Sequence, residues 1–241
     1  MQQQSRSITS NQSGPHEDVP SAVARYWHSD FQKPYAAHSE AAFAEVDRLL
    51  QNSSKPLILD SCCGVGESTA YLAARYPEAL VVGVDKSAHR LGKHVAHQRH
   101  GETGEYLLVR ADLNDFWRLA HAAEWPVQKH FVLYPNPWPK KKHLGRRWHG
   151  APVFPALVKL GGELEMRSNW QTYLDEFALA LACLQIPAQV EKLPTNLEPI
   201  TPFERKYQAC GQALWRLQSE LTVPNLLAAD ELAAVRATLL T

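Results

Sequence analysis

The segment Leu133–Gly150, LYPNPWPKKKHLGRRWHG, brings together a proline-bracketed asparagine, a tryptophan and five cations. Pro135 and Pro137 fix the backbone dihedral φ on either side of Asn136, and each also restricts the residue before it, so the asparagine is held in an extended corner. A rigid amide can hydrogen-bond to the edge of a nucleobase. Trp138 adds a ring on which a base can stack, which indicates a site that holds a nucleobase.

A local basic field follows this corner. Its cations are Lys140, Lys141, Lys142, Arg146 and Arg147, interleaved with His143, Trp148 and His149. No Asp or Glu lies between Trp125 and Gly162, although the whole chain has 25 Lys+Arg and 25 Asp+Glu. Such a field suits a phosphate backbone, whereas the alternative interpretations of a basic run are a solvated surface and a localisation signal.

Upstream of the corner, three acids end three successive apolar runs. Asp60 ends PLILD, Asp85 ends ALVVGVD and Asp112 ends YLLVRAD. Gly64 and Gly66 follow the first acid and allow a tight turn that can approach a ligand closely. An acid about 20 residues beyond such a turn accepts hydrogen bonds from ribose hydroxyls in Rossmann-like folds, and the second acid occupies this position.

The charge of these acids indicates which cofactor they suit. Three carboxylates would repel the pyrophosphate of a dinucleotide, whereas S-adenosylmethionine has no phosphate and carries a sulfonium and an ammonium. We expect Asp60 near the methionine end, Asp85 at the ribose with Lys86 beside it, and Asp112 at the border of the adenine. The alternative is that each acid only caps the helix that follows it.

The elements that must position these residues alternate along the chain. Strand-like runs cover 56–60, 79–85, 106–112, 129–135 and 161–168, and helical patterns cover 67–76, 87–97, 114–122, 151–160 and 170–184. This alternation predicts an α/β fold with a mainly parallel sheet and helices on both faces. Ligands of such sheets bind at the carboxyl ends of the strands, where the acids and the corner lie.

Composition and length place these elements in one globular protein. We expect a flexible polar tail over 1–20, a helical or irregular extension over 21–55, one large domain over 56–221 and a C-terminal helical tail over 222–241. The four cysteines, Cys62, Cys63, Cys183 and Cys210, form no CxxC pair, so neither structural zinc nor a disulfide framework is expected. No apolar run is long enough to cross a membrane, and a cytoplasmic protein is predicted.

The segments LDSCCGVGEST, YPNPWPKKKHLGRR and TPFERK together resemble the bacterial tRNA (guanine-N7-)-methyltransferases, over roughly residues 56–217. The resemblance implies a Rossmann-like class I methyltransferase that uses S-adenosylmethionine to form 7-methylguanosine in tRNA, as a monomer or a homodimer and without a metal. It implies cofactor binding by the three acids and the glycine turn. The residues implied to contact substrate are Trp138, Lys140, His143, Arg146, Arg147 and Asn169, with Thr201, Phe203 and Glu204 closing over the site.

Two amides depart from the family's pattern. Asn136 replaces the aspartate of the Pro-Asp-Pro-Trp corner, and Asn169 replaces the aspartate before Trp170. Guanine N7 has a free lone pair and no proton to lose, so its methylation needs alignment and charge stabilisation rather than a general base. Asn136 is therefore predicted to position the base, while the missing negative charge predicts a slower or retargeted enzyme.

Two further functions are left open by the sequence. Enzymes that methylate the exocyclic amine of adenine or cytosine carry an Asn- or Asp-Pro-Pro-aromatic corner, of which Asn136–Pro139 is a scrambled relative. An RNA-binding protein that keeps the fold without methyl transfer is the other alternative, and retained cofactor affinity would separate the two classes. His94, His97 and His100 are predicted to lie along one helix face that runs into a loop, with a metal site as the alternative.

Overall fold

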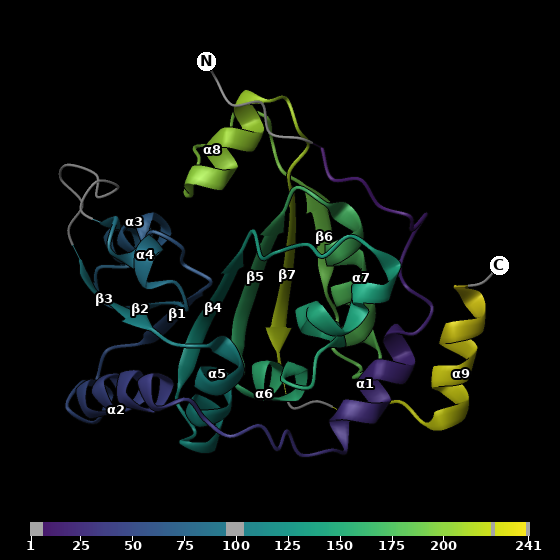
Figure 1. Ribbon diagram of the computed structural model, residues 1–241, viewed down its shortest axis with the longest axis horizontal. Helices are drawn as coiled ribbons and strands as arrows, with labels where there is room; N and C mark the ends of the chain where they lie inside the picture. The colour runs from purple at the N-terminus through teal and green to yellow at the C-terminus, as the bar shows by residue number, and fades with distance from the viewer. Residues whose placement is uncertain (1–6, 95–103, 223–224, 240–241) are drawn as a thin grey trace.

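The computed structural model describes residues 7–94, 104–222 and 225–239, and within them the chain forms one seven-stranded sheet (Figure 1). The strand order is β3-β2-β1-β4-β5-β7-β6. The strands are β1 (Leu57–Ser61), β2 (Leu80–Asp85), β3 (Glu105–Arg110), β4 (Val127–Leu133), β5 (Gly162–Ser168), β6 (Gln189–Lys192) and β7 (Trp215–Leu221). Strands β1 to β5 are parallel, while β7 runs antiparallel to both β5 and β6, so the expected mainly parallel sheet is confirmed.

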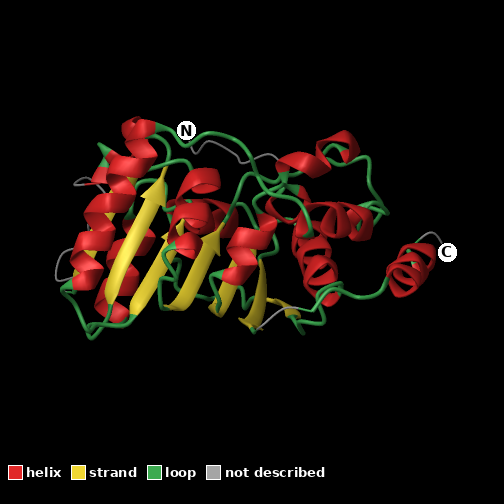
Figure 2. Ribbon diagram, turned by 90° about the horizontal axis from the view of Figure 1, so that it is seen from below, coloured by secondary structure: helices red, strands yellow, loops and turns green. Residues whose placement is uncertain are grey.

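Helices lie on both sides of the sheet, as the alternating pattern predicted (Figure 2). Helix α3 (Glu67–Arg75) and the short α4 (Ala88–Leu91) pack on β2 and β3. The other helices are α1 (Val19–Trp27), α2 (Ala37–Gln51), α5 (Leu113–Ala122), α6 (Phe154–Lys159), α7 (Gln171–Ala182), α8 (Pro202–Ala209) and α9 (Ala229–Thr238), with 3₁₀ turns η2 (Lys141–Arg146) and η3 (Trp148–Gly150) after β4.

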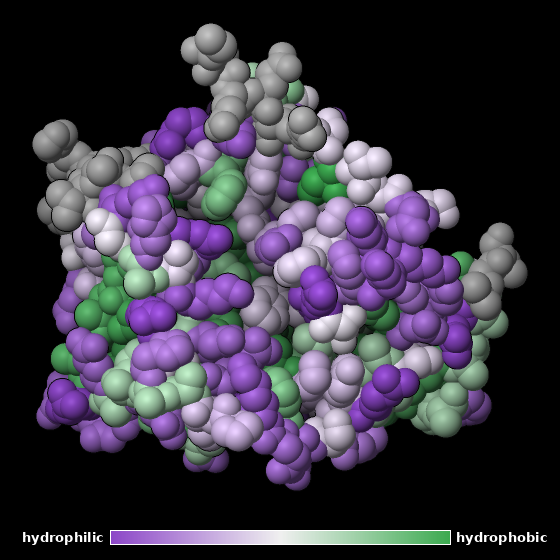
Figure 3. All heavy atoms as spheres, in the orientation of Figure 1, coloured by the Kyte–Doolittle hydropathy of each residue, from purple (hydrophilic) through white to green (hydrophobic). Residues whose placement is uncertain are grey.

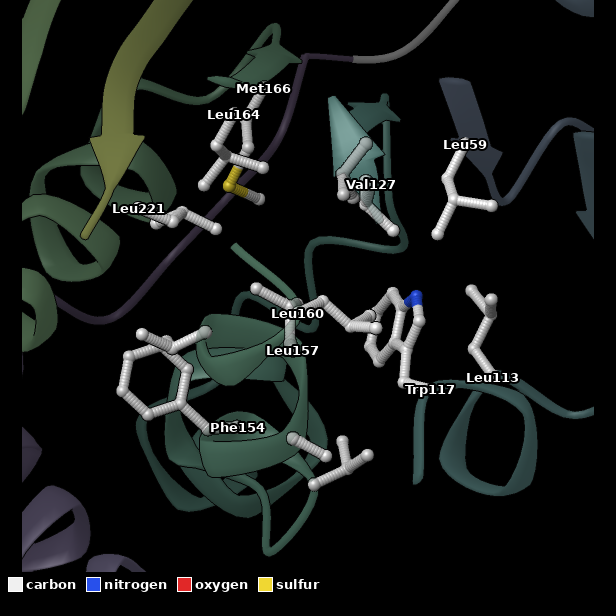
Figure 4. Close-up of a cluster of buried hydrophobic side chains, with 14 of the residues drawn as sticks. Leu59, Leu113, Trp117, Val127, Phe154, Leu157, Leu160, Leu164, Met166 and Leu221 are labelled. Carbon is white, nitrogen blue, oxygen red and sulfur yellow. The ribbon is translucent and has the colours of Figure 1, made fainter. Parts of the chain in front are cut away.

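The central strands are buried on both faces, which explains their continuous apolar sequences. Along β1, Leu57 and Leu59 point into one hydrophobic core and Ile58 points into the other, as the two-residue period of a strand requires. Figure 4 shows the larger core, where Leu59, Val127, Leu164 and Met166 of the strands face Trp117 of α5 and Leu157 of α6. These packed layers hold the carboxyl ends of β1 to β5 along one edge.

Residues 10–16 contact the folded domain, whereas the sequence predicts a flexible tail over 1–20, of which residues 1–6 lie outside the described part of the chain. Ser10 donates a hydrogen bond to the carbonyl oxygen of Pro139 at 2.7 Å, and the Gln12 amide donates to Glu176 of α7 at 2.7 Å. Helix α1 then begins at Val19 and packs on α6, α7 and α9. The polar side chains of the segment are ordered because they find partners on the folded domain.

The helix expected over 87–97 is much shorter where the structure describes it. Helix α4 ends at Leu91, and residues 95–103 lie outside the described part of the chain. Of the three histidines in this region, His94 bonds to the carbonyl oxygen of Val65 and to the Tyr106 hydroxyl, both at 2.9 Å. His97 and His100 lie outside the described residues.

Candidate functional site

Asp60 is the second-to-last residue of β1 and is buried beneath the turn that begins α3. One carboxylate oxygen accepts hydrogen bonds from the Ser68 hydroxyl at 2.6 Å and the Thr69 hydroxyl at 2.7 Å. The other oxygen, Oδ1, is buried and has no hydrogen-bond partner among the described residues. Burial raises the pKa of this carboxyl group to about 6. A buried acid with an unsatisfied oxygen fits a site that receives a cationic ligand group.

The glycine turn takes a backbone conformation that side chains resist. Gly64 has φ +64° and Gly66, the N-cap of α3, has φ +78°. A side chain at Gly66 would collide with Leu108 and His94, whereas one at Gly64 would point into open space. Cys62 has φ +67° in the same turn without being a glycine, which costs conformational energy.

Asp85 closes β2 directly across from this turn. Its carboxylate accepts hydrogen bonds from the Gly64 amide at 3.1 Å and the Ser87 amide at 2.8 Å, and Arg90 pairs with it at 3.2 Å. Asp85 therefore ties the end of β2 to the glycine turn after β1. Lys86 follows it and is exposed.

Asp112 has the capping role that the sequence left open as an alternative. It is the N-cap of α5, and its Oδ1 accepts hydrogen bonds from the Asn114 backbone amide at 2.9 Å and side-chain amide at 2.8 Å. Its Oδ2 lies 3.5 Å from the Lys33 ammonium. Neither Asp60 nor Asp85 is the N-cap of the helix that follows it, because Gly66 caps α3 and Ser87 caps α4.

The corner after β4 is strained on both sides of the asparagine. Tyr134 has φ +50° and Trp138 has φ +45°, which are unusual values for bulky residues and which often mark functional sites. Asn136 between them is exposed, and its side chain makes no hydrogen bond to any described residue. Because β4 pairs with β1 in parallel, with Val132 opposite Ser61, this corner and the glycine turn lie at neighbouring strand ends.

The basic run contains exposed cations and cations that are held in ion pairs. Lys140, Lys142 and Arg146 are exposed, and the Arg146 guanidinium lies 4.7 Å from the centre of the Trp138 ring. The His143 ring stands nearly perpendicular to the same tryptophan ring, with centroids 5.5 Å apart and an interplanar angle of 88°. The remaining lysine of the run, Lys141, pairs with Glu17 at 2.6 Å.

Arg147 was predicted to anchor substrate, and its position in the structure contradicts this prediction. Its side chain is fully buried and pairs with Glu176 of α7 at 2.5 Å. A guanidinium withdrawn from solvent cannot contact a phosphate backbone, so its charge does not belong to the exposed basic field. Arg146 and Arg147 are adjacent and chemically identical, so the sequence alone does not show that only Arg147 is buried.

Helix α8 lies near the upper end of the sheet in Figure 1 and carries the TPFERK element. Thr201 is buried and caps the helix by accepting a hydrogen bond from the Glu204 amide at 3.0 Å. Glu204 is fully buried and accepts hydrogen bonds from the Tyr134 hydroxyl at 2.9 Å and from Arg167 at 2.8 Å. Phe203 is 45% exposed. Thr201 and Glu204 therefore hold α8 in place, and of the three residues predicted to close over the site only Phe203 is exposed.

Other contacts complete the site. Asn169 donates from its side-chain amide to Gln212 at 2.8 Å. Arg205 of α8 pairs with Glu67 in the first turn of α3, which connects α8 to the glycine turn. Glu67, Tyr134 and Glu176 were not predicted from the sequence, because each has its partner far away in the chain. Figure 3 shows a mostly hydrophilic face with a recess near its centre.

Some features lie away from this edge. A groove of about 560 Å³ on the open face of β4, β5 and β7 is lined by Lys129, Glu163, Glu165 and Gln218 among others. Across the described ranges, no three His, Cys, Asp or Glu residues are grouped so that they could hold a metal ion. No helix in the described part of the chain is both long and apolar enough to cross a membrane.

Comparisons with known proteins agree with this architecture. A family model described as "Putative methyltransferase" matches residues 54–217. The tRNA (guanine-N(7)-)-methyltransferase of Thiobacillus denitrificans is 26% identical over 194 residues, which cover 77% of this chain and 80% of the relative. The enzyme of the same name from a Nocardioides species is 32% identical over 168 residues, covering 67% and 66%.

Solved structures show the same fold at low sequence identity. An antibiotic-related methyltransferase superposes with a TM-score of 0.55 at 11% identity, covering 78% of this chain and 96% of that one. A variant of the 16S rRNA (adenine(1408)-N(1))-methyltransferase of Catenulisporales acidiphilia, solved with S-adenosylmethionine, gives 0.51 at 20% identity and covers 83% and 96%. The strand order and the glycine turn thus define a Rossmann-like class I methyltransferase. The chain belongs to the bacterial tRNA (guanine-N7-)-methyltransferase family, as its motifs indicated.

Proposed function

We propose that this protein transfers a methyl group from S-adenosylmethionine to guanine N7 in tRNA, in the cytoplasm. One observation carries the proposal: the exposed Asn136 corner lies at the strand end next to the glycine turn and the buried Asp60. A cationic cofactor and a nucleobase would therefore meet at adjacent strand ends. The relatives named tRNA (guanine-N(7)-)-methyltransferase support tRNA and guanine N7 as the substrate.

The residues at the turn fit S-adenosylmethionine. The unsatisfied Asp60 oxygen suits the cationic methionine end, and the open space at Gly64 leaves room for a ligand against the backbone. Asp85 has lone pairs beyond the three hydrogen bonds it accepts and would hold the ribose, next to the exposed Lys86. Asp112 would border the adenine from its capping position. When bound, the cofactor supplies a methyl group activated by its sulfonium.

The corner supplies alignment rather than acid–base chemistry. Asn136 would accept a hydrogen bond from guanine N1–H or N2–H₂ through its side-chain carbonyl, and the half-buried Trp138 and the exposed Phe203 would offer ring surface for stacking. Lys140, Lys142 and Arg146 would contact the phosphate backbone, with His143 beside them and Asn169 at the end of β5. Thr201 and Glu204 contribute by fixing α8.

The test is transfer of labelled methyl from S-adenosylmethionine to unmodified tRNA, followed by nucleoside digestion and mass spectrometry. We expect 7-methylguanosine as the labelled product. If the label were found instead on the exocyclic amine of adenine or cytosine, that amine and not guanine N7 would be the methylated group. Cofactor binding without transfer to any RNA would mean that the protein binds RNA and has lost catalysis.

A further inference from the structure

A buried polar cluster lies directly behind the corner. It consists of Gln12, Arg147, His149 and Glu176, which come from the N-terminal segment, the 3₁₀ region after β4 and α7. The side chains of Arg147, His149 and Glu176 are all 0% exposed. None of the four was needed to account for cofactor or RNA binding, so the cluster requires an explanation of its own.

Glu176 is the centre of the cluster. Its carboxylate accepts hydrogen bonds from Arg147 at 2.7 and 2.5 Å, from His149 Nε2 at 2.8 Å, from the Gln12 amide at 2.7 Å and from the backbone amide of His16 at 2.9 Å. Burial raises the pKa of Glu176, but the hydrogen bonds from His149 and Arg147 and the positive charge of Arg147 outweigh it, so the pKa lies below its ordinary value. The carboxylate is therefore ionised and fully satisfied.

His149 takes part in this arrangement as a neutral ring. Burial lowers its pKa, and its Nδ1 atom is buried without a partner among the described residues, which fits an imidazole that donates only from Nε2. The cluster then holds one positive charge on Arg147 and one negative charge on Glu176. Its net charge is zero, as a dry interior requires.

Arg147 uses its remaining donors on the corner itself. Its Nε and one terminal nitrogen donate to the carbonyl oxygen of Trp138 at 3.2 and 3.1 Å, and the same terminal nitrogen reaches the carbonyl oxygen of Lys140 at 3.3 Å. These carbonyls lie on either side of Pro139, in the segment where Trp138 has a positive φ. The planar guanidinium thus joins the α7 carboxylate to the backbone of the corner, which the single ammonium of a lysine could not do.

The N-terminal segment holds the same backbone from the other side. Ser10 donates to the carbonyl oxygen of Pro139 at 2.7 Å, and the side chain of Asn11 accepts a hydrogen bond from the Lys141 amide at 2.9 Å. Gln12 accepts from Arg147 at 2.6 Å and donates to Glu176. The backbone of residues 138–141 is thereby fixed at four successive positions.

We propose that Glu176 is a positioning residue for methyl transfer: by holding Arg147 it fixes the carbonyls of Trp138 and Lys140, and so the placement of Asn136 and Lys140 toward the substrate. The proposal rests on the proposed function. A buried ion pair contributes little net stability compared with a packed apolar pair, whereas it can specify one conformation of the chain around it. A single conformation is important at the strained corner, because a displacement of a substrate-positioning group such as Asn136 by about 1 Å can lower the rate a hundredfold.

The test compares two variants with a control. Arg147→Lys keeps the charge pair but loses the planar guanidinium that donates to several acceptors at once. The double variant R147M/E176L removes both charges together, so that no unpaired charge is buried. The control is Arg216→Met, which breaks ion pairs with Glu165 and Glu191 on the open face of the sheet. For each protein we would measure cofactor Kd, kcat with tRNA, and amide hydrogen exchange across residues 138–147.

We expect both variants to lower kcat about ten- to hundredfold and to raise amide exchange in 138–147 at least tenfold, with cofactor Kd within twofold of the original protein. The control should change none of these. Unchanged kcat in Arg147→Lys, or unchanged exchange in 138–147, would overturn the proposal. Equal loss of cofactor binding would also overturn it, because it would show a general structural role.

The exchange measurement separates this inference from the proposed function. It uses the free protein and needs no methyl transfer, so it decides whether Glu176 and Arg147 order the corner even if another RNA or no RNA is methylated. Absence of transfer by the original protein would refute the proposed function and the catalytic consequence of the cluster together. Faster exchange in the two variants would then still establish that the cluster orders the corner.

Discussion

The Tyr134 hydroxyl donates a hydrogen bond of 2.9 Å to Glu204, which joins the last residue before the corner to the helix that carries Phe203. Both residues are buried, and Glu204 also accepts from Arg167 and from the Ile200 amide. The pKa of Tyr134 is raised by burial and by the charge of Glu204, so the phenol stays protonated and donates. The end of β4 and the start of α8 are therefore one connected unit.

Tyr134→Phe removes this donor and leaves a buried carboxylate with one partner fewer. We expect the free energy of unfolding to fall by about 1–3 kcal/mol, measured by urea denaturation, because a buried acceptor loses a hydrogen bond. The control is Tyr207→Phe, since the Tyr207 ring lies 5.6 Å from that of Tyr134 and its ring contact survives the change. A larger loss for Tyr207→Phe would contradict this, because it would assign the stabilisation of α8 to the Tyr207 hydroxyl rather than to the Tyr134–Glu204 hydrogen bond.

Asp60 predicts a pH dependence of cofactor binding. Its folded pKa of about 6 lies above the ordinary value of 3.8, so the free protein holds a proton below pH 6 that a cationic ligand must displace. We expect the Kd for S-adenosylmethionine, measured by calorimetry, to rise about fivefold as pH falls from 6 to 5. Asp60→Asn should bind weakly with no such dependence between pH 5 and 7, and a dependence that persisted in this variant would assign the proton to another group.

Asn136→Asp restores a carboxylate at the exposed corner. A charged acceptor forms stronger hydrogen bonds to guanine N1–H and N2–H₂ and stabilises the positive charge that develops on the purine, so we expect kcat to rise about tenfold. Labelled-methyl kinetics on tRNA measure this. Asn169→Asp is the comparison, and a smaller gain is expected because Asn169 already donates to Gln212. A tenfold fall in Asn136→Asp would indicate that the amide serves a different base.

The exposed cations predict the salt dependence of RNA binding. Arg146→Gln and Lys142→Gln should each weaken tRNA affinity and reduce the slope of log K against log salt by about one, as expected when one phosphate contact is lost. Lys129→Gln, on the open face of the sheet beside Glu163, serves as the control. An equal change of slope in the control would show that net charge, rather than the basic field at the corner, determines binding.

The five parallel strands could be predicted because each is a short apolar run whose pattern is local. The final two strands could not be recognised as easily, since β6 reads Gln-Val-Glu-Lys and has no fully buried residue. In β7 the alternation of buried Leu217, Ser219 and Leu221 with polar neighbours was present in the sequence and was missed.

The positions of Asp60, Asp85 and Asn136 at neighbouring strand ends could be predicted from the apolar runs that precede them, while their roles in binding stay predictions. The prediction was wrong for Arg147, because burial depends on Glu176, which lies 29 residues further along the chain. A glutamate in a helix ordinarily faces solvent, so nothing local marked Glu176 as buried. The ordering of residues 10–17 was missed for the same reason, because its partners come from distant segments.

The order of the strands has a consequence for synthesis. β7 lies between β5 and β6, and β6 pairs with β7 alone in the described sheet, so both neighbours precede their shared partner in the chain. Until Trp215–Leu221 has left the ribosome, β5 presents an open edge and β6 has nothing to pair with. An open strand edge invites pairing with other chains. Ribosomes that stall or terminate before residue 221 would therefore release products that contain the whole corner and glycine turn and yet are prone to aggregate.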